Sequence, residues 1–448
     1  MNHEELLSIA SGVVAQAATN EQIEVACSHG TSTSVRAYDG EVESMSSAED
    51  MGLGVRVLVD GREGFASAGS LDSDVVSDTL DQARANAGFA ERDPYVGIAE
   101  PDGVEAVAVD LWSDEIETMT PDDKIRIALE VEKRVRTGHE KIVGVRVASY
   151  GDSAASFALA STSGISASTK ATSAGVSVQA LAEDGESTQT GYGFDAARKP
   201  SELSIDSVVD DAISRSVALL GAQKPASAKV DLVLEPRQAA TIFGLIASTL
   251  SGDRIVKGRS PFVDRVGEVI ASEKLTFVDD PTDLRSLAAD SHDGEGLACR
   301  KNSLVVDGVL QGYLHDSYTG RRSGEGSTAS ALRGTRGLPA PGVQALSIAG
   351  GQGSFDELLA DVETGLFVYG LAGLHSGVNA VSGDFSVGVE GIMVRNGELA
   401  EPVSECTIGS TLQRLLLDIT AIGAEVDYLA SGVAAPPVII GDVALAGA

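Results

Sequence analysis

Two Asp-Gly pairs near the start of the chain, Asp39-Gly40 and Asp60-Gly61, constrain its fold most strongly. Each pair lies between short apolar segments with partly alternating side chains, and this arrangement is a strong signal for a β-hairpin. An amphipathic helix is expected before them, at residues 4–18. The pattern therefore predicts antiparallel strands at residues 23–27, 34–38, 42–46, 52–59 and 64–68.

After residue 68, apolar residues no longer alternate with polar ones as in a strand; they recur every three to four residues, as in a helix. One helix is predicted from Asp72 to Gly88. A second begins at Thr120, a capping residue followed by proline at the first turn, and ends at Gly138. Strands return as a β-meander, and a further helix closes the first half of the chain. The predicted segments are the strands 143–149, 156–161, 165–172 and 173–183 and the helix 204–220.

Small and polar residues with a proline, at positions 221–228, form the best candidate domain boundary. The chain is 448 residues long, which favours two domains over one. We expect an α+β protein with an N-terminal mixed domain at residues 1–221, whose strands are antiparallel, and a mostly β C-terminal domain at 229–448. The C-terminal elements predicted are helices at 238–250 and 412–422 and strands at 230–234, 266–271, 275–278, 303–306, 309–314, 365–369, 385–395 and 434–440.

The charge balance argues against a direct partner among nucleic acids. The chain has 33 basic and 66 acidic residues, a formal net charge of −33, which repels phosphate backbones. Its three cysteines, Cys27, Cys299 and Cys406, are widely spaced and are expected to be reduced thiols. No secretory signal or bilayer-spanning segment is evident, so a cytoplasmic protein is expected. The Gly-x-Ser-x-Gly pentapeptide of a serine hydrolase is absent.

Three groups of segments together resemble the TldD/TldE family (PmbA, "modulator of DNA gyrase") over nearly the whole chain. Each group alone is a weak glycine pattern, but their order and spacing are specific. They are Gly52 to Phe65; Asp293 to Gly296 with Asp307-Gly308 and Tyr313 to Arg322; and Ser382 to Ser386 with Asn396-Gly397, Pro402-Val403 and Thr407 to Gly409.

The resemblance also implies where a zinc site stands in the TldD-type subunit of this family. There, a helix carries His-Glu-x-x-x-His, followed after one residue by Leu-x-Gly-Asp, and the glutamate serves as general base. This chain retains the tail of the motif as Leu250, Gly252 and Asp253. Counting back along the sequence places Phe243 and Ser248 at the two histidine positions and Gly244 at the glutamate position.

The remaining part of the TldD-type site, a cysteine near the C-terminus, is expected where this sequence has Val433 and Ala434. The resemblance therefore implies that this chain holds no metal and has no catalytic residues of its own. His292, His315 and His375 could in principle replace the lost ligands, but no two of them show ligand spacing.

Five residues are candidates for a cleft, and each also has a simpler structural interpretation. Asp253 could line a cleft or stabilise the end of a helix. Phe243, which is not among the five, is expected to pack in a core. His292 and Asp293 could transfer protons or form a turn. His315 ends a strand, and Arg321 could hold a peptide carboxylate or neutralise acidic surroundings. The candidate cleft residues are Asp253, His292, Asp293, His315 and Arg321.

The TldE (PmbA) branch of the family lacks the zinc motif, and the missing ligands place this chain nearer to that branch. The resemblance implies a metalloprotease-family subunit that pairs with a TldD-like chain, which supplies the zinc, in proteolysis of unfolded or extended peptides. We expect a homodimer when the partner is absent. The alternative is a regulatory binding protein without enzymatic activity that acts on a toxin, an antitoxin or a topoisomerase. An independent peptidase with an unrecognised site ranks last.

Overall fold

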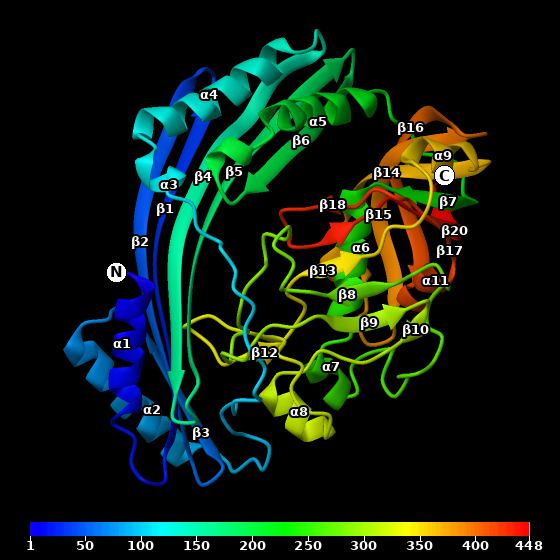
Figure 1. Cartoon of the computed structure of the whole chain (residues 1–448). Coiled ribbons are helices and arrows are strands. Elements are labelled where there is room, and N and C mark those ends of the chain that lie inside the picture. The colour runs from blue at the N-terminus through cyan, green and yellow to red at the C-terminus, as the bar shows by residue number, and fades with distance from the viewer. Residues whose placement is uncertain (448) are drawn as a thin grey trace.

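The computed structural model describes residues 1–447 and has two halves, shown in Figure 1. A long curved sheet with helices on one face is formed by the first half of the chain. The second half is a compact group of shorter strands that lies against the other face of this sheet. The fold is α+β, as the sequence predicts. No helix among residues 1–447 is long and apolar enough to cross a membrane.

The first sheet is antiparallel throughout, with strand order β3-β2-β1-β4-β5-β6. Asp39 and Gly40, and likewise Asp60 and Gly61, adopt positive φ in the turns that join β1 to β2 and β2 to β3, as their hairpin role requires. The strands are β1 Gln22–Tyr38, β2 Glu41–Val59, β3 Arg62–Ala68, β4 Ile142–Ser161, β5 Ser166–Asp184 and β6 Ser187–Ala197.

The prediction of short strands in this half is wrong in length. Residues 23–27 and 34–38 are the two ends of the single strand β1, and the predicted pair 143–149 and 156–161 belongs to the single strand β4. The middle of β1 is rich in Ser, Thr and Gly, and so lacks the apolar alternation that marks a strand. Its continuity comes from pairing with both β2 and β4 over this polar stretch.

The helices of the first half cover the two ends of one face of the sheet. One core cluster forms under α1 and α2, and another forms under α4 and α5. The predicted helix caps are present: Thr120 Oγ1 accepts the N–H of Asp123 at 3.2 Å, and Pro121 is the first helical residue of α4. The helices are α1 His3–Val14, α2 Ser73–Phe89, α3 Glu115–Thr118, α4 Pro121–Thr137 and α5 Ile205–Ala218, with the 3-10 turn Pro200–Glu202 before α5.

The second half contains two six-stranded sheets, ordered β16-β15-β14-β7-β20-β17 and β10-β9-β8-β13-β19-β18, and the small pair β11-β12. In the first of these, β16 also pairs with β20, which curls the sheet on itself. The strands are β7 Ala228–Leu234, β8 Phe277–Asp279, β9 Asn302–Val306, β10 Val309–Leu310, β11 Ala331–Leu332, β12 Ala340–Pro341, β13 Leu346–Ile348, β14 Thr364–Ala372, β15 Asp384–Arg395, β16 Glu398–Thr411, β17 Ile419–Ile422, β18 Asp427–Tyr428, β19 Ala434–Ala435 and β20 Val438–Ala446.

The largest core cluster of the protein surrounds α6, which packs between the two larger sheets of this half. Four sequence predictions are wrong here. The predicted strand 309–314 is a strand only at Val309–Leu310, and the predicted strand 434–440 is divided between β19 and β20, which belong to different sheets. Residues 266–271 form turns with one isolated bridge, and the helix predicted at 412–422 ends at Leu417, because Ile419–Ile422 pairs with β20 as β17. The helices are α6 Pro236–Ser248, α7 Gly252–Val256, α8 Ser317–Ser323, α9 Phe355–Ala360, α10 Leu374–Gly377 and α11 Leu412–Leu417.

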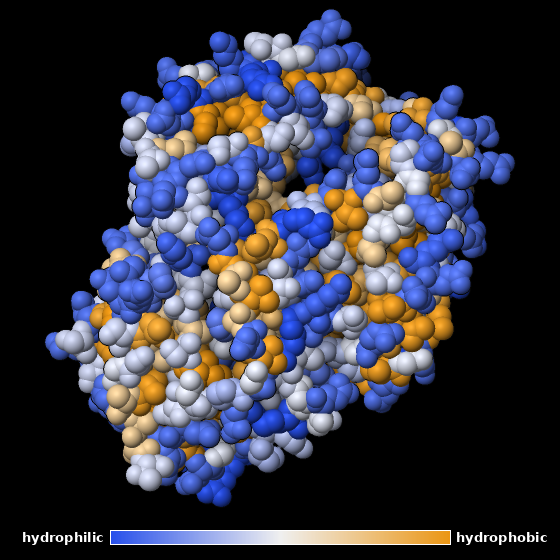
Figure 2. Space-filling model, in the orientation of Figure 1, coloured by the Kyte–Doolittle hydropathy of each residue, from blue (hydrophilic) through white to orange (hydrophobic). Residues whose placement is uncertain are grey.

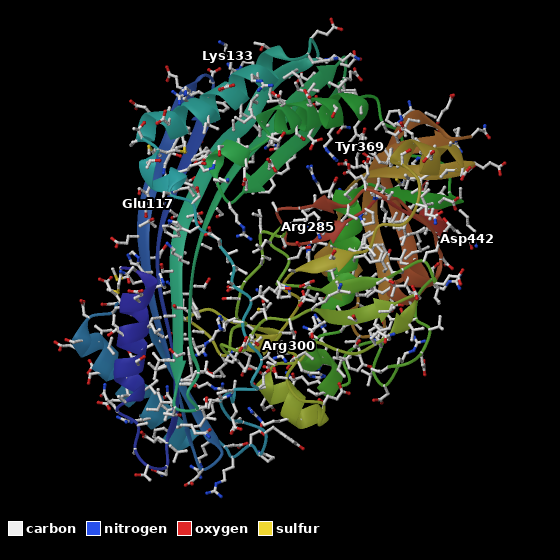
Figure 3. All side chains as sticks on the ribbon, in the orientation of Figure 1. Glu117, Lys133, Arg285, Arg300, Tyr369 and Asp442 are labelled. Atoms are coloured by element: carbon white, nitrogen blue, oxygen red, sulfur yellow. The ribbon has the colours of Figure 1, made fainter. Side chains whose placement is uncertain are left out.

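Polar contacts join the two halves along a seam on the helix-free face of the first sheet. Arg300, labelled in Figure 3, pairs with Asp102, and Tyr318 donates its hydroxyl to Asp93 at 2.9 Å. The loop between β11 and β12 approaches β2 so closely that a Cβ added to Gly54 would lie 2.5 Å from the carbonyl oxygen of Thr335. Glycine in β2 therefore allows the loop of the second half to contact the sheet backbone directly.

Replacing Gly54 by alanine is expected to lower the free energy of unfolding by about 1–3 kcal/mol, because the added methyl group forces the seam apart. The measurement is the midpoint of chemical denaturation. Gly144→Ala in β4 is the matched control, since a Cβ there meets no heavy atom within 4 Å. Equal midpoints for the two variants would show that the close approach at Gly54 does not matter for stability.

Candidate functional site

Helix α6 carries the three positions that the resemblance aligns with the zinc motif. Pro236 is the first residue of α6, a position whose N–H would have no partner within the helix. Most of the other side chains of α6 are buried. Phe243 is 1% exposed, and its ring lies 6.4 Å from that of Phe277 on β8. The first histidine position is therefore occupied by a packed core side chain.

The other two motif positions also lack groups that could bind zinc. Gly244 has no side chain, and a Cβ built there would lie 4.0 Å from Cγ2 of Val433. The C-terminal segment in which the resemblance expects a cysteine thus lies directly against α6. Ser248 donates its hydroxyl to the carbonyl of Leu245, 2.7 Å away within the same helix.

These residues do not fit a zinc ion. Zinc in proteins takes Cys, His, Asp or Glu ligands, whereas the positions gathered here carry phenylalanine, glycine, serine and valine. Over the described residues 1–447, no three or more His, Cys, Asp or Glu side chains are grouped so that they could hold a metal. The positions that the resemblance aligns with the zinc site therefore offer no side chain that binds zinc well.

The retained tail of the motif has a structural use. Gly252 donates its N–H to the carbonyl of Leu314 at 2.7 Å, and a Cβ added to it would lie 2.3 Å from Nδ1 of His315 and 2.6 Å from Oγ1 of Thr319. The neighbouring Asp253 is 45% exposed and pairs with Lys257 at 2.5 Å. Gly252 therefore lets α7 pack against α8, and Asp253 forms a surface ion pair.

Gly252→Ala is expected to lower the free energy of unfolding by about 1–3 kcal/mol, because no free space remains beside His315. The control is Asp253→Ala, which removes only an exposed ion pair and is expected to change stability by about 0.5 kcal/mol or less. Denaturation of both variants followed by circular dichroism checks the difference. If alanine at 252 proved as harmless as alanine at 253, the contact with His315 would not explain the glycine.

His315 is fully buried; Nδ1 has a hydrogen-bond partner, whereas Nε2 has none among residues 1–447 and has only an ion-pair contact. Nδ1 lies 3.1 Å from Oγ1 of Thr319, and Nε2 lies 3.4 Å from a carboxylate oxygen of Glu325. Burial lowers the pKa of His315, and the Glu325 carboxylate opposes this shift. These surroundings favour a neutral imidazole, which lies between Thr319 of α8 and Glu325 in the loop that follows α8.

His292 and Asp293 lie in a turn at the edge of a cavity of about 350 Å³. Asp293 accepts the N–H groups of Glu295 and Leu297 at one oxygen and that of Ala331 at the other, at 2.9–3.1 Å. Burial raises its pKa to about 6. Burial also lowers the pKa of His292, whose Nδ1 is 2.8 Å from the hydroxyl of Ser291. The Asp293 carboxylate therefore stabilises the turn through hydrogen bonds from three backbone N–H groups.

Arg321 binds the segment that connects α2 to α3. Its guanidinium donates to the carbonyls of Tyr95, Gly97 and Ile98, at 2.8, 2.6 and 3.4 Å. These bonds use the donors that a peptide carboxylate would need. Of the five candidate cleft residues, the structure brings only His292 and Asp293 together at one cavity, and it places Asp253, His315 and Arg321 elsewhere.

A larger cleft, of about 580 Å³, lies between the two halves and was not predicted from the sequence. Its walls are β6 and α5 on one side and the start of α6 and residues 426–431 on the other, and Figure 2 shows the hollow. Tyr192 and Phe194 of β6 are 48% and 39% exposed and stack with ring centroids 6.3 Å apart. In the sequence, the feature that could have indicated this cleft is the pair of aromatic residues at alternate positions of β6, a strand made mostly of small residues.

Charged side chains close one end of this cleft. Arg215 of α5 donates from Nη2 to both carboxylate oxygens of Glu235, at 2.8 and 2.6 Å, and lies over the ring of Tyr369 at 5.4 Å. Figure 3 shows Tyr369 beside the gap between the halves. The cleft thus combines an aromatic wall with a paired charge cluster, next to the helix that carries Phe243.

Comparison with known proteins places the whole chain in one family. Three family models match in order: PmbA/TldA metallopeptidase domain 1 at residues 23–87, the central domain at 114–220 and the C-terminal domain at 227–447. The metalloprotease PmbA of Escherichia coli O157:H7 is 27% identical over 442 residues, which is 98% of this chain and 94% of that protein. The metalloprotease TldD homolog of Haemophilus influenzae is 24% identical, over 91% of this chain and 89% of its own length.

Solved structures agree with the sequence relatives. A candidate modulator of DNA gyrase from Bacteroides thetaiotaomicron is 26% identical, covers 100% of both chains and superposes with a TM-score of 0.91. TldE from Thermococcus kodakarensis, at 22% identity and 99% coverage of both chains, shares the fold with a TM-score of 0.87. The chain belongs to the PmbA/TldD metallopeptidase family.

Proposed function

We propose that this chain is the non-catalytic partner subunit of a TldD/TldE-type zinc metalloprotease complex that acts on unfolded or extended peptides. The observation that carries the proposal is the packing of α6. Phe243, Gly244 and Ser248 stand at the motif positions, with Val433 against Gly244, so the frame of the site is kept without metal ligands. The zinc and the general base come from a TldD-like partner.

The cleft beside α6 supports an extended peptide as the bound molecule. Among the described strands, β6 pairs only with β5, so its other edge can offer main-chain hydrogen bonds to a peptide. Such bonds tolerate many sequences, since they involve only the backbone. Tyr192 and Phe194 add apolar contact area next to this edge. The peptide is held here and in the partner while the partner's zinc site cleaves it.

The test is reconstitution. The chain is purified alone and together with a TldD-like chain from the same cells, and zinc content and hydrolysis of an unfolded peptide are measured for both. We expect no bound zinc and no hydrolysis for the single chain, which forms a homodimer in light scattering, and hydrolysis for the pair. Stoichiometric zinc and peptide cleavage by the single chain would refute the division of labour.

Recovery of bound proteins from the cytoplasm of its own cells separates this function from the regulatory alternative. A TldD-like chain as the main partner supports the proposal. Recovery of a topoisomerase or a toxin–antitoxin protein without any TldD-like chain would instead favour a regulatory binding protein. The net charge of −33 makes nucleic acid an unsuitable partner in either case.

A further inference from the structure

The cavity beside His292 has the composition of a small-molecule site, and it is separate from the peptide cleft. It has a volume of about 350 Å³ and lies between the helix-free face of the first sheet and loops of the second half. This volume is within the lower range of ligand sites in proteins. One wall is apolar and is formed by Phe157, Leu159 and Ala167.

Arg333, which lines this cavity, has two side-chain nitrogens without a hydrogen-bond partner among residues 1–447. Its side chain is fully buried, and Nη1 pairs with a carboxylate oxygen of Glu24. Nε and Nη2 have no hydrogen-bond acceptor among the described residues. These two nitrogens lie on one edge of the guanidinium, the edge that binds a carboxylate by two parallel hydrogen bonds. Leaving such donors unpaired in the interior is costly, so an acceptor from outside the chain is favoured.

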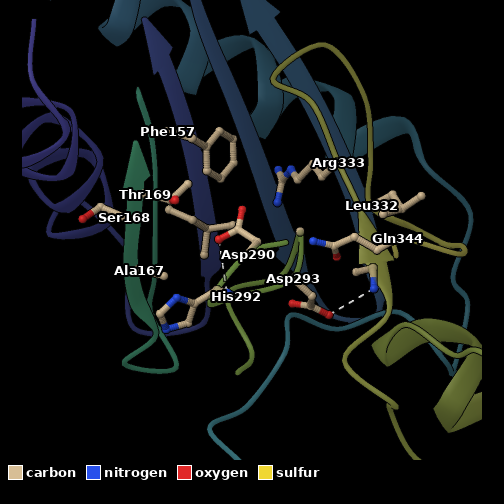
Figure 4. Close-up of a pocket in the computed structure, with 14 residues that line it drawn as sticks. Phe157, Ala167, Ser168, Thr169, Asp290, His292, Asp293, Leu332, Arg333 and Gln344 are labelled. Carbon is tan, nitrogen blue, oxygen red and sulfur yellow. Dashed lines mark hydrogen bonds between the residues drawn. The ribbon is translucent and has the colours of Figure 1, made fainter. Parts of the chain in front are cut away.

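A carboxyl group is the second polar feature of the cavity. Asp290 accepts the N–H of Ser291 at 2.7 Å on one of its oxygens, which fixes its orientation. Figure 4 shows the Asp290 carboxyl and the Arg333 side chain near each other among the residues that line the cavity. The guanidinium edge of Arg333, the carboxyl group of Asp290 and the apolar wall surround one small cavity. They match, in that order, the carboxylate, the amino or amide nitrogen and the side chain of an amino acid.

We propose that this cavity binds an α-carboxylate that carries an apolar side chain, as a free amino acid or as the C-terminal residue of a peptide. The carboxylate is held by the Nε–Nη2 edge of Arg333, the nitrogen faces Asp290, and the side chain lies against Phe157 and Leu159. Because the edge of Arg333 is covered in the described conformation, binding includes a small rotation of the guanidinium toward the cavity. The site needs neither zinc nor the partner subunit.

Binding to the isolated chain tests the proposal by titration calorimetry with L-leucine, L-alanyl-L-leucine and L-leucinamide, which lacks the carboxylate. We expect saturable heat with at least one of the two carboxylates and none with the amide. Tighter binding of leucine identifies a free amino acid as the ligand, and tighter binding of the dipeptide identifies a peptide C-terminus. No binding of either carboxylate, or equal binding of leucinamide, would overturn the proposal whether or not the chain acts in a protease complex.

Two variants connect the binding to the named residues. Arg333→Lys keeps a charge for Glu24 but loses the two-nitrogen edge, so affinity is expected to fall about tenfold or more. Arg336→Lys, an exposed residue of the same loop, is the matched control and should bind normally. Ala167→Leu adds a larger side chain to the apolar wall of the cavity and should also abolish binding. Unchanged affinity in both Arg333→Lys and Ala167→Leu would contradict the assigned site.

Discussion

Replacing Phe243 by alanine is expected to lower the free energy of unfolding by about 3–5 kcal/mol, the range for an aromatic side chain removed from a packed core. The side chain is 1% exposed and contacts Phe277 within the largest core cluster. Chemical denaturation measures the loss. Because the same position is occupied by a metal ligand in the zinc-bearing relatives that the resemblance describes, the result tests directly what this chain uses the position for.

Two further variants sharpen that result. Thr241→Ala, on the exposed side of the same helix, is the control and is expected to change stability by about 0.5 kcal/mol or less. Phe243→His places an imidazole among apolar side chains without a hydrogen-bond partner, and is expected to destabilise without creating zinc affinity. If Phe243→Ala were tolerated, or if Phe243→His bound zinc, position 243 would not be a core position and the proposed role of the chain would lose its main support.

Local signals in the sequence predicted the turns and helix starts well. Asp-Gly pairs gave the hairpins, and Thr120 with Pro121 gave the start of α4 to the residue. Both depend on neighbours in the sequence, which is why they could be read from it. The length of the strands in the first sheet could not be predicted in the same way. The polar middle of β1 lacks apolar alternation, and it is a strand because it pairs on one side with β2 and on the other with β4, more than 100 residues away.

The candidate site was predicted only in part, for a related reason. Titratable residues such as Arg321 and Asp293 are visible in a sequence, but the backbone groups that use up their hydrogen-bonding capacity are not. The cleft lined by Tyr192 and Phe194 is built from residues of both halves, and its segment at 426–431 lies almost 200 residues after the others. The positions aligned with the zinc motif rest on a short sequence motif and stay a prediction; the structure places Val433 next to Gly244. The proposed boundary at residues 221–228 stays a prediction.

Glu295 gives the seam between the halves an expected dependence on pH. It is fully buried, and Oε2 accepts the N–H of Ser317 at 2.7 Å, whereas Oε1 has no partner among residues 1–447 and lies 3.9 Å from Nη1 of Arg56. Burial, together with the carboxylates of Glu24, Asp293 and Asp316, raises its pKa to about 8. Arg56 is also paired with Glu24 and with Glu63, so its charge is largely compensated and burial decides the direction.

The sign of the effect follows from the raised pKa. In the unfolded chain Glu295 ionises near its ordinary value of 4.5, and in the folded chain only near 8. The stability that it contributes is complete below the unfolded pKa and is lost as the pH rises to the folded pKa, at about 1.4 kcal/mol per pH unit. The wild type is therefore expected to lose stability relative to Glu295→Gln between about pH 5 and 8, by an amount on the order of a few kcal/mol.

The measurement is the difference between the two unfolding free energies at several pH values. Asp279, whose pKa burial also raises to about 6, is present in both proteins and cancels. Asp293 interacts with Glu295, so the difference reports Glu295 together with its effect on Asp293. Glu91→Gln, at an exposed position, should give a flat difference curve. A flat curve for Glu295→Gln as well would mean that the buried carboxyl is ionised at neutral pH. Arg56 would then stabilise it, and the seam would be held by a charged pair instead of a neutral acid.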